Sequence, residues 1–186
     1  TMGGDIAAVA AMSGFEVTLQ DISADAVDRA IERARTLYER RLKAPQKVEA
    51  AMARLRADAG GEGLASADLL IEAVAEDLAI KKAVFADAES KMKPGAIMAT
   101  NTSAIPLEDI GAALNDPARL IGMHFFNPVP VLPLVEVVYT DASDGSFVDR
   151  AMYVCGALKK LPVRCKSAPG FLVNRALLPY VFKAVE

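Results

Sequence analysis

The single histidine of the chain, His124, ends an apolar run from Leu120 that is typical of a buried strand. Glu136 lies at the centre of a second apolar run, residues 134–138. A carboxylate inside a buried strand is costly unless it has a partner, and the simplest partner is the imidazole that ends the neighbouring run. A carboxylate that orients an imidazole is the arrangement of a general base with its helper. The alternative, a core histidine beside an unrelated edge-strand glutamate, stays open on this stretch alone.

Three prolines, Pro128, Pro130 and Pro133, separate these two apolar runs. Proline has no backbone N–H and a fixed φ angle, so regular structure cannot continue through this stretch. The two runs are therefore predicted to be strands joined by an irregular loop.

A second group of polar side chains follows two further apolar runs, residues 68–74 and 96–100, with a predicted helix over residues 78–92 between them. These runs are predicted to be parallel strands whose carboxyl ends meet at one edge of a sheet. The group comprises Glu72, Glu76, Lys81, Asn101 and Ser103. Ligands bind at that edge in open α/β sheets. In the alternative interpretation, Ser103 caps a helix and Lys81 is a solvated helix residue.

The beginning of the chain has the pattern of half a nucleotide-binding unit. Residues 6–12 predict a helix that ends near Gly14, and residues 15–21 predict a strand that ends in Asp21. Gly3 matches the last glycine of G-x-G-x-x-G, and the spacing to Asp21 suits the acid that binds the adenosine ribose. A carboxylate there repels a 2′-phosphate, which favours NAD over NADP. The first strand and the first two glycines are absent, and Asp21 could instead cap the following helix.

The remaining pattern alternates helices and strands, which predicts a Rossmann-type, doubly wound, mainly parallel sheet. Residues 24–57 predict two amphipathic helices broken around Ala44-Pro45, with a cluster of basic side chains. That cluster is a solvated face or a surface for an anionic substrate such as a coenzyme A phosphate. Further expected elements are a flexible loop at 60–63, helices at 107–114 and 144–159, a strand at 161–165, a turn at 167–170 and an apolar helix from Phe171. We expect a dinucleotide-binding domain over residues 1–166 and the start of an all-α domain over residues 167–186.

Composition narrows the class of protein. The chain has 186 residues, 53% hydrophobic and 24% charged, with a net charge of −3. These values indicate a globular protein without an electrostatic footprint for nucleic acid or an anionic membrane. The sequence has no apolar run long enough to span a membrane, and we expect no signal peptide. Cys155 and Cys165 form no metal or redox motif, and two unpaired thiols predict a reducing compartment such as the cytoplasm.

Four segments, taken together, strongly resemble the 3-hydroxyacyl-CoA dehydrogenase family. They are GMHFFNP (122–128), NTS (101–103), EAVAED (72–77) and PGFLVNR (169–175). Their order and spacing match over nearly the whole chain. The run at 2–8 and the linker around Lys43 look most like the dehydrogenase portion of multifunctional fatty-acid β-oxidation enzymes.

The resemblance implies NAD-dependent oxidation of L-3-hydroxyacyl-CoA to 3-oxoacyl-CoA, and it assigns roles to residues. His124 would be the base that takes the proton of the substrate 3-hydroxyl, with Glu136 as its partner. Ser103 and Asn174 would hold substrate oxygens. Residues implied in NAD binding are Gly3, Asp21, Glu76, Lys81, Ser103 and Asn127, and no metal site is implied.

The resemblance also implies partners and leaves two alternatives. We expect an acyl-CoA substrate and either a homodimer or a place within a multifunctional β-oxidation enzyme. The alternatives are a short-chain 3-hydroxybutyryl-CoA dehydrogenase and a non-catalytic dinucleotide-binding domain kept for structure. Because the first strand and most of the helical domain are absent, we expect a fragment with little activity by itself.

Overall fold

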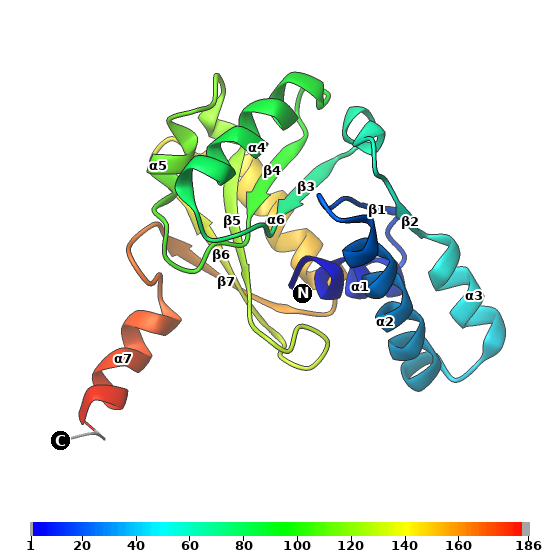
Figure 1. Ribbon diagram of the computed structural model, residues 1–186. Coiled ribbons are helices and arrows are strands. Elements are labelled where there is room, and N and C mark those ends of the chain that lie inside the picture. Colours follow the sequence, from blue (N-terminus) through cyan, green and yellow to red (C-terminus); the bar gives the residue numbers. More distant parts are fainter. Residues whose placement is uncertain (1, 184–186) are drawn as a thin grey trace.

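The helices and strands largely alternate along the chain, except at α2–α3, β2–β3 and β5–β6 (Figure 1). The structure, a computed structural model, describes residues 2–183 and their side chains except those of residues 178–182. The helices are α1 (Met2–Met12), α2 (Ala24–Leu42), α3 (Pro45–Ala53), α4 (Leu78–Lys91), α5 (Leu107–Gly111), α6 (Gly145–Ala157) and α7 (Val173–Lys183). The strands are β1 (Val17–Leu19), β2 (Leu55–Ala57), β3 (Leu69–Glu72), β4 (Ile97–Thr100), β5 (Leu120–Phe125), β6 (Leu134–Tyr139) and β7 (Leu161–Lys166). Short 3₁₀ turns lie at η1 (Glu62–Ala65) and η2 (Pro117–Arg119).

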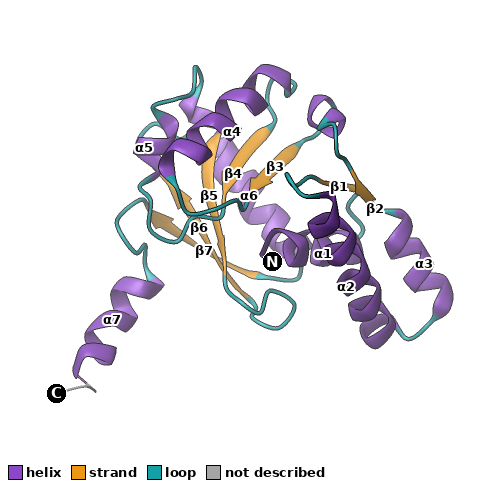
Figure 2. Cartoon of the chain, viewed as in Figure 1, coloured by secondary structure: helices purple, strands orange, loops and turns teal. Residues whose placement is uncertain are grey.

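Five strands form the central sheet in the order β3-β4-β5-β6-β7 (Figure 2). The pairs β3–β4, β4–β5 and β6–β7 are parallel, and β5–β6 is antiparallel. One face packs against α1 and α6, and the other packs against α4 and α5. The prediction of a doubly wound, mainly parallel sheet is confirmed.

The strands β1 and β2 form a separate parallel pair. Among the described residues, no strand joins this pair to β3. Strand β2 differs from the prediction, since the sequence pattern places residues 55–57 at the end of a helix. Leu55 is buried and pairs with Val17, so tertiary packing overrides the local helical pattern here.

Helix α1 holds the two sheets together. Its small residues Ala7, Ala8 and Ala11 pack against α2, α3 and β2, while Ile6 and Val9 pack against the central sheet. A helix made of such small side chains can be approached closely on both sides. The Tyr38 hydroxyl of α2 donates to the Ala8 carbonyl oxygen at 2.9 Å and fixes this packing.

Several element boundaries differ from the sequence prediction; the expected helix at 107–114, for example, ends at Gly111. Helix α1 begins at Met2 and not at Ile6, and the 3₁₀ turn at residues 62–65 begins within the expected loop at 60–63 and extends beyond it. Helix α7 begins at Val173, because Phe171 has a positive φ of 46° and its ring is buried in the core. The α2–α3 break at Pro45 and the end of α1 near Gly14 were predicted correctly.

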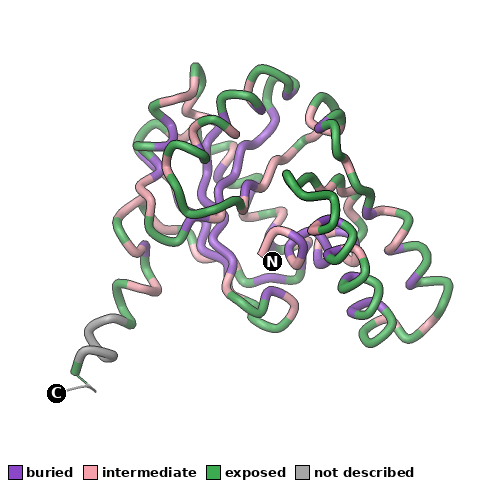
Figure 3. The backbone as a smooth tube through the Cα atoms, in the orientation of Figure 1, coloured by how far each residue is buried: buried purple, intermediate pink, exposed green. Residues whose placement is uncertain are grey.

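Burial is concentrated in the central strands (Figure 3). Helix α7 extends away from the sheet, and two leucines, Leu172 just before it and Leu177 within it, are 50% and 54% exposed. Within the described residues, no helix combines the length and apolar character that a membrane crossing requires.

Candidate active site

The antiparallel pairing of β5 and β6 places His124 directly opposite Glu136. The His124 Nδ1 lies 2.7 Å from Glu136 Oε2, so the predicted contact between the two side chains is present. Two residues before His124, Gly122 faces Val138, where a Cβ atom would come within 2.7 Å of the Val138 Cβ. Glycine at this position therefore lets the two strands keep the register that the pair needs.

The second carboxylate oxygen of Glu136 accepts hydrogen bonds from the backbone N–H groups of Leu172 and Val173, both at 2.8 Å. Glu136 is fully buried, at 0% exposure. Burial by itself would raise the pKa of the Glu136 carboxyl, but the bonds from His124, Val173 and Leu172 outweigh it and lower the pKa below its ordinary value. The carboxylate is therefore held in its charged form between the imidazole and the first turn of α7.

Two aromatic rings enclose the imidazole. The Phe126 ring centroid lies 4.5 Å from that of His124, and the Phe171 ring approaches edge-on at 5.7 Å. With Nδ1 bound to Glu136, the Nε2 atom has no hydrogen-bond partner among the described residues. Every buried polar side-chain atom of the described residues has a hydrogen-bond partner. Because Nε2 has none, it is not fully buried, and it is accessible to solvent or to a ligand. A base with one nitrogen oriented and the other accessible can exchange a proton with a bound molecule.

A second buried pair lies at the carboxyl end of β3. The Lys81 ammonium is 2.7 Å from Glu72 Oε1, and both side chains are almost completely buried. Glu72 also accepts from the Val74 N–H at 2.7 Å and from the Thr100 hydroxyl at 2.8 Å. Lys81 is 1% exposed, so its interpretation as a solvated helix residue is wrong.

Glu76 joins this pair to the Ser103 loop. Its Oε2 lies 3.3 Å from the Lys81 Nζ, and its Oε1 accepts from the Thr102 hydroxyl at 2.5 Å and the Ser103 N–H at 2.9 Å. Burial would raise the pKa of Glu76, but these bonds, led by those from Thr102 and Ser103, lower it. Ser103 does not cap α5, whose N-cap position is Pro106, so the capping interpretation is wrong.

The remaining predicted residues at this edge are held to different degrees. The Asn101 Oδ1 accepts from the Phe125 N–H at 2.8 Å, which ties β4 to the end of β5. Asn127 is exposed just beyond β5. Asn174 lies against Gly170, and it has no side-chain hydrogen bond to the described part of the chain. The structure thus brings Glu72, Glu76, Lys81 and Ser103 into one network, and it leaves Asn174 without a contact to that network.

Gly3 and Asp21 lie at the edge where a dinucleotide is expected. A Cβ on Gly3 would meet the Ala73 Cβ at 3.5 Å, so the amino end of α1 packs closely on the end of β3. Asp21 is exposed beyond β1, and one of its oxygens accepts from the Ser23 N–H at 3.0 Å. The cap of α2 is Ser23 and not Asp21. The Asp21 carboxylate therefore keeps capacity to accept hydrogen bonds from ribose hydroxyls, which fits the predicted cofactor.

Two features that the sequence left open have structural uses. On α2 and its C-terminal end, Arg35 pairs with Glu49 and Arg41 donates to the Pro130 carbonyl oxygen, so part of the basic cluster is used within the fold. Burial raises the pKa of Cys155 to about 12 and that of Cys165 to about 11, which keeps both thiols protonated and unreactive.

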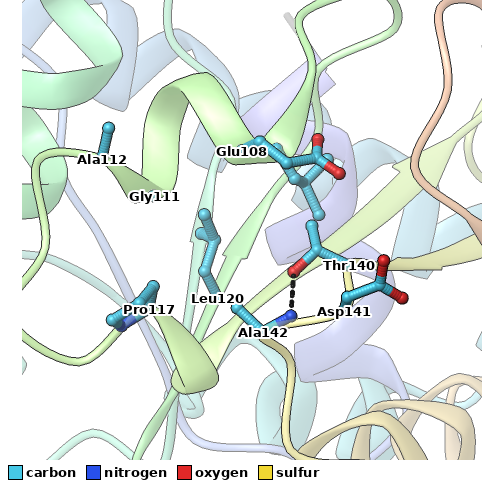
Figure 4. A pocket seen from close by; sticks show the side chains of 9 residues that line it. Glu108, Gly111, Ala112, Pro117, Leu120, Thr140, Asp141 and Ala142 are labelled. Carbon is cyan, nitrogen blue, oxygen red and sulfur yellow. Dashed lines mark hydrogen bonds between the residues drawn. The ribbon is translucent and has the colours of Figure 1, made fainter.

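A shallow pocket of ≈ 410 Å³ lies away from these residues, between α5 and the end of β6 (Figure 4). Leu107, Leu120 and Pro117 form its apolar wall. The Thr140 hydroxyl accepts from the Ala142 N–H at 3.1 Å and lies 3.3 Å from the Ser143 hydroxyl, so its contacts stay within its own turn. Leu120 begins β5, whereas His124 lies near its other end, so this pocket opens at the opposite edge of the sheet from the His124–Glu136 pair.

Comparison with known proteins identifies the family to which these motifs belong. The family model described as 3-hydroxyacyl-CoA dehydrogenase, NAD binding domain, matches residues 1–168. The 3-hydroxyadipyl-CoA dehydrogenase of Escherichia coli (strain K12) is 42% identical over 188 residues, which cover 99% of this chain and 40% of the relative. The fatty acid oxidation complex subunit alpha of Acinetobacter baylyi is 37% identical over 183 residues, covering 96% of this chain and 26% of the relative.

Solved structures agree with the sequence relatives. The (S)-3-hydroxybutyryl-CoA dehydrogenase PaaH1 from Ralstonia eutropha has a TM-score of 0.94 at 32% identity, covering 99% of this chain and 66% of the other. The chain spans between 26% and 65% of the length of four curated relatives. Since the matched family is a NAD-binding domain, the cofactor of the domain is NAD.

Proposed function

The chain belongs to the family of 3-hydroxyacyl-CoA dehydrogenase NAD-binding domains, and from this premise we propose that it serves the NAD-dependent oxidation of L-3-hydroxyacyl-CoA to 3-oxoacyl-CoA in fatty-acid β-oxidation. The observation that carries the proposal is the His124–Glu136 pair, bonded at 2.7 Å through Nδ1. It lies on neighbouring strands at the edge of the sheet where α/β domains bind their ligands. NAD⁺ supplies the hydride acceptor for such an oxidation.

In this proposal His124 acts as the general base. Its Nε2 accepts the proton of the substrate 3-hydroxyl, while Glu136 keeps Nδ1 protonated and stabilises the imidazolium that forms. The lowered pKa of Glu136 suits this role, because the carboxylate stays charged throughout. In the reverse direction the same imidazole returns the proton to the 3-oxo group.

Ser103 and Asn174 are proposed to bind substrate oxygens. The Ser103 hydroxyl makes one long contact, 3.4 Å to Glu76 Oε1, and a bond of that length is readily exchanged for one to a ligand. The Asn174 side chain has its amide donors and acceptor uncommitted to other described groups. A role for both residues would require α7 to lie over the carboxyl edge of the sheet, and the Glu136 bonds to Leu172 and Val173 support that placement.

The residues proposed to bind NAD are Gly3, Asp21, Glu76, Lys81, Ser103 and Asn127. Asp21 would accept from the adenosine ribose hydroxyls and exclude a 2′-phosphate. Lys81 is 1% exposed, so we propose that it contributes by holding Glu76 and not by a direct contact.

The substrate is proposed to be an acyl-CoA thioester, and the proposal does not specify the length or chemistry of its acyl chain. The printed names of the relatives include hydroxyadipyl, hydroxybutyryl and fatty-acid oxidation enzymes, which differ in their acyl parts. The proposed partners are a second copy of the chain or the other parts of a multifunctional β-oxidation enzyme, as in the subunit alpha relative.

The test is the loss of NADH absorbance with acetoacetyl-CoA, measured with this chain and with the chain extended to the length of its relatives. The proposal expects turnover in the extended protein that is abolished by His124→Gln. NADH binding without turnover in a folded, extended protein would overturn it in favour of a non-catalytic dinucleotide-binding domain. A series of substrates from 3-oxobutyryl-CoA to longer chains would then distinguish a short-chain enzyme from a broad one.

A further inference from the structure

The connection between β5 and β6, residues 126–133, is here called the proline loop. Three of its eight positions are proline, so it has few N–H groups with which to satisfy its own carbonyl oxygens. Within the loop, the Pro128 carbonyl oxygen accepts from the Val131 and Leu132 N–H groups at 2.9 and 3.0 Å. The other carbonyl oxygens need donors from elsewhere in the fold.

Lys160 supplies two of these donors. Its ammonium group donates to the carbonyl oxygens of Val129 and Leu132, the latter at 2.8 Å. Lys160 is 7% exposed, and no carboxylate of the described residues forms an ion pair with it. Burial, with a smaller contribution from the Arg41 charge, lowers the pKa of this lysine. A buried ammonium group is costly unless its N–H groups are hydrogen-bonded. Lys160 meets this requirement only while the loop carbonyl oxygens point toward it, so the contact favours one conformation of the loop.

Two further contacts complete the attachment of the loop. The Arg41 Nη2 donates to the Pro130 carbonyl oxygen at 3.2 Å, and the Leu161 N–H donates to that of Pro133 at 2.8 Å. Lys160 is therefore the central member of a set of donors that come from α2 and from the α6–β7 connection.

The proline loop begins with two residues of the candidate active site. Phe126 packs its ring 4.5 Å from the His124 ring, and Asn127 is among the residues proposed to bind NAD. We propose that Lys160 is a positioning residue of this site: by binding the Val129 and Leu132 carbonyl oxygens it fixes the Phe126 ring against His124 and the Asn127 side chain toward the cofactor. The Phe126 part stands on geometry alone, and the Asn127 part rests on the proposed function.

The first experiment uses the fact that the chain has one histidine. At a single pH, the ring protons of His124 give one set of NMR signals, whose chemical shift depends on the ring current of Phe126. Lys160→Met keeps the aliphatic stem and removes the ammonium group. We expect the native His124 signals to move in this variant. A role limited to overall stability would change the folded fraction without moving the native signals.

Lys159→Met is the matched control. Lys159 is the preceding residue, is exposed, and carries the same type of side chain. The inference predicts unchanged His124 signals in this control. If Lys160→Met does not fold, Arg41→Gln decides the question, because it removes a donor to the same loop from an exposed position. Movement of the His124 signals in that variant supports the proposal, and unmoved signals count against it.

NADH titration tests the Asn127 part. We expect Lys160→Met to bind NADH about tenfold more weakly, which is the scale of one lost hydrogen bond. Unchanged affinity together with unmoved His124 signals would overturn the inference while leaving the proposed function intact. Failure of the wild-type chain to bind NADH would count against the proposed function, and the His124 signals would still test Lys160.

Discussion

Two buried carboxylates at the same edge of the sheet, Glu136 and Glu72, each hold a basic side chain at 2.7 Å, and the two pairs differ in what remains available on the base. His124 uses one nitrogen and has no described partner for the other. Lys81 is enclosed between two carboxylates at 1% exposure. The first pair can exchange a proton with a ligand, whereas the second can only hold its neighbours. We therefore expect chemistry from the first and stability from the second.

The largest effect should come from His124→Gln. We expect turnover with acetoacetyl-CoA to fall by about 10²- to 10⁴-fold, the usual contribution of general base catalysis. Urea unfolding should change little, because the glutamine amide can donate to Glu136 in place of Nδ1. Activity within tenfold of wild type, measured with the extended protein, would break the assignment of chemistry to this pair.

Lys81→Met should mainly lower the stability of the fold. Removing the cation leaves Glu72 buried without its partner, and loss of one member of a buried ion pair costs about 3–5 kcal/mol. Urea denaturation would measure the loss, with Lys82→Met at the next, partly exposed helix position as control. The control should change stability by about 0.5 kcal/mol or less. Equal denaturation midpoints for the two variants would contradict a stabilising role for the Lys81–Glu72 pair.

Acid should weaken the fold through the carboxylates whose pKa is lowered. The pKa of Glu136 lies below the reference value of 4.5. Its contribution to the free energy of unfolding is therefore complete above pH 4.5 and is lost as the pH falls through the lowered pKa. Each unit by which the pKa is lowered is worth about 1.4 kcal/mol. Urea unfolding at a series of pH values measures this contribution. Below pH 4.5, the free energy of unfolding should fall less steeply with decreasing pH for Glu136→Gln than for wild type. Parallel curves would show that Glu136 does not contribute to acid stability.

The pattern of the sequence was sufficient for the elements that rely on local signals. Alternating apolar runs and helices predicted the central strands, and Pro45 marked the break between α2 and α3. The His124–Glu136 contact was also within reach, because a charge in an apolar run demands a partner. Strand β2 was missed because residues 55–57 continue a helical pattern, and only their pairing with β1 makes them a strand.

The bonds made by backbone groups could not be foreseen. Nothing in the residue types indicates that the N–H groups of Leu172 and Val173 occupy the second oxygen of Glu136. The uses of Lys81 and Lys160 were hidden for a related reason. A lysine on a helix or in a connection is usually solvated, and its burial depends on carboxylates or carbonyls distant in sequence.

Asp21 extends the comparison to a carboxylate that is exposed and makes a single hydrogen bond, to the Ser23 N–H. If capacity left open marks function, Asp21→Asn should cost little stability, about 0.5 kcal/mol or less, and should act on the cofactor. Loss of a charged acceptor should weaken NADH binding by about 10- to 100-fold, since such bonds are worth about 1.5–3 kcal/mol. It should also narrow the preference for NADH over NADPH, because the repulsion of a 2′-phosphate is removed.

Paired titrations with NADH and NADPH measure this preference. Asp28→Asn, which changes an exposed carboxylate further along α2, is the control. An unchanged preference in Asp21→Asn would mean that the Asp21 carboxylate does not bind the ribose. The relation between an uncommitted polar atom and function would then hold for the base His124 but not for this carboxylate.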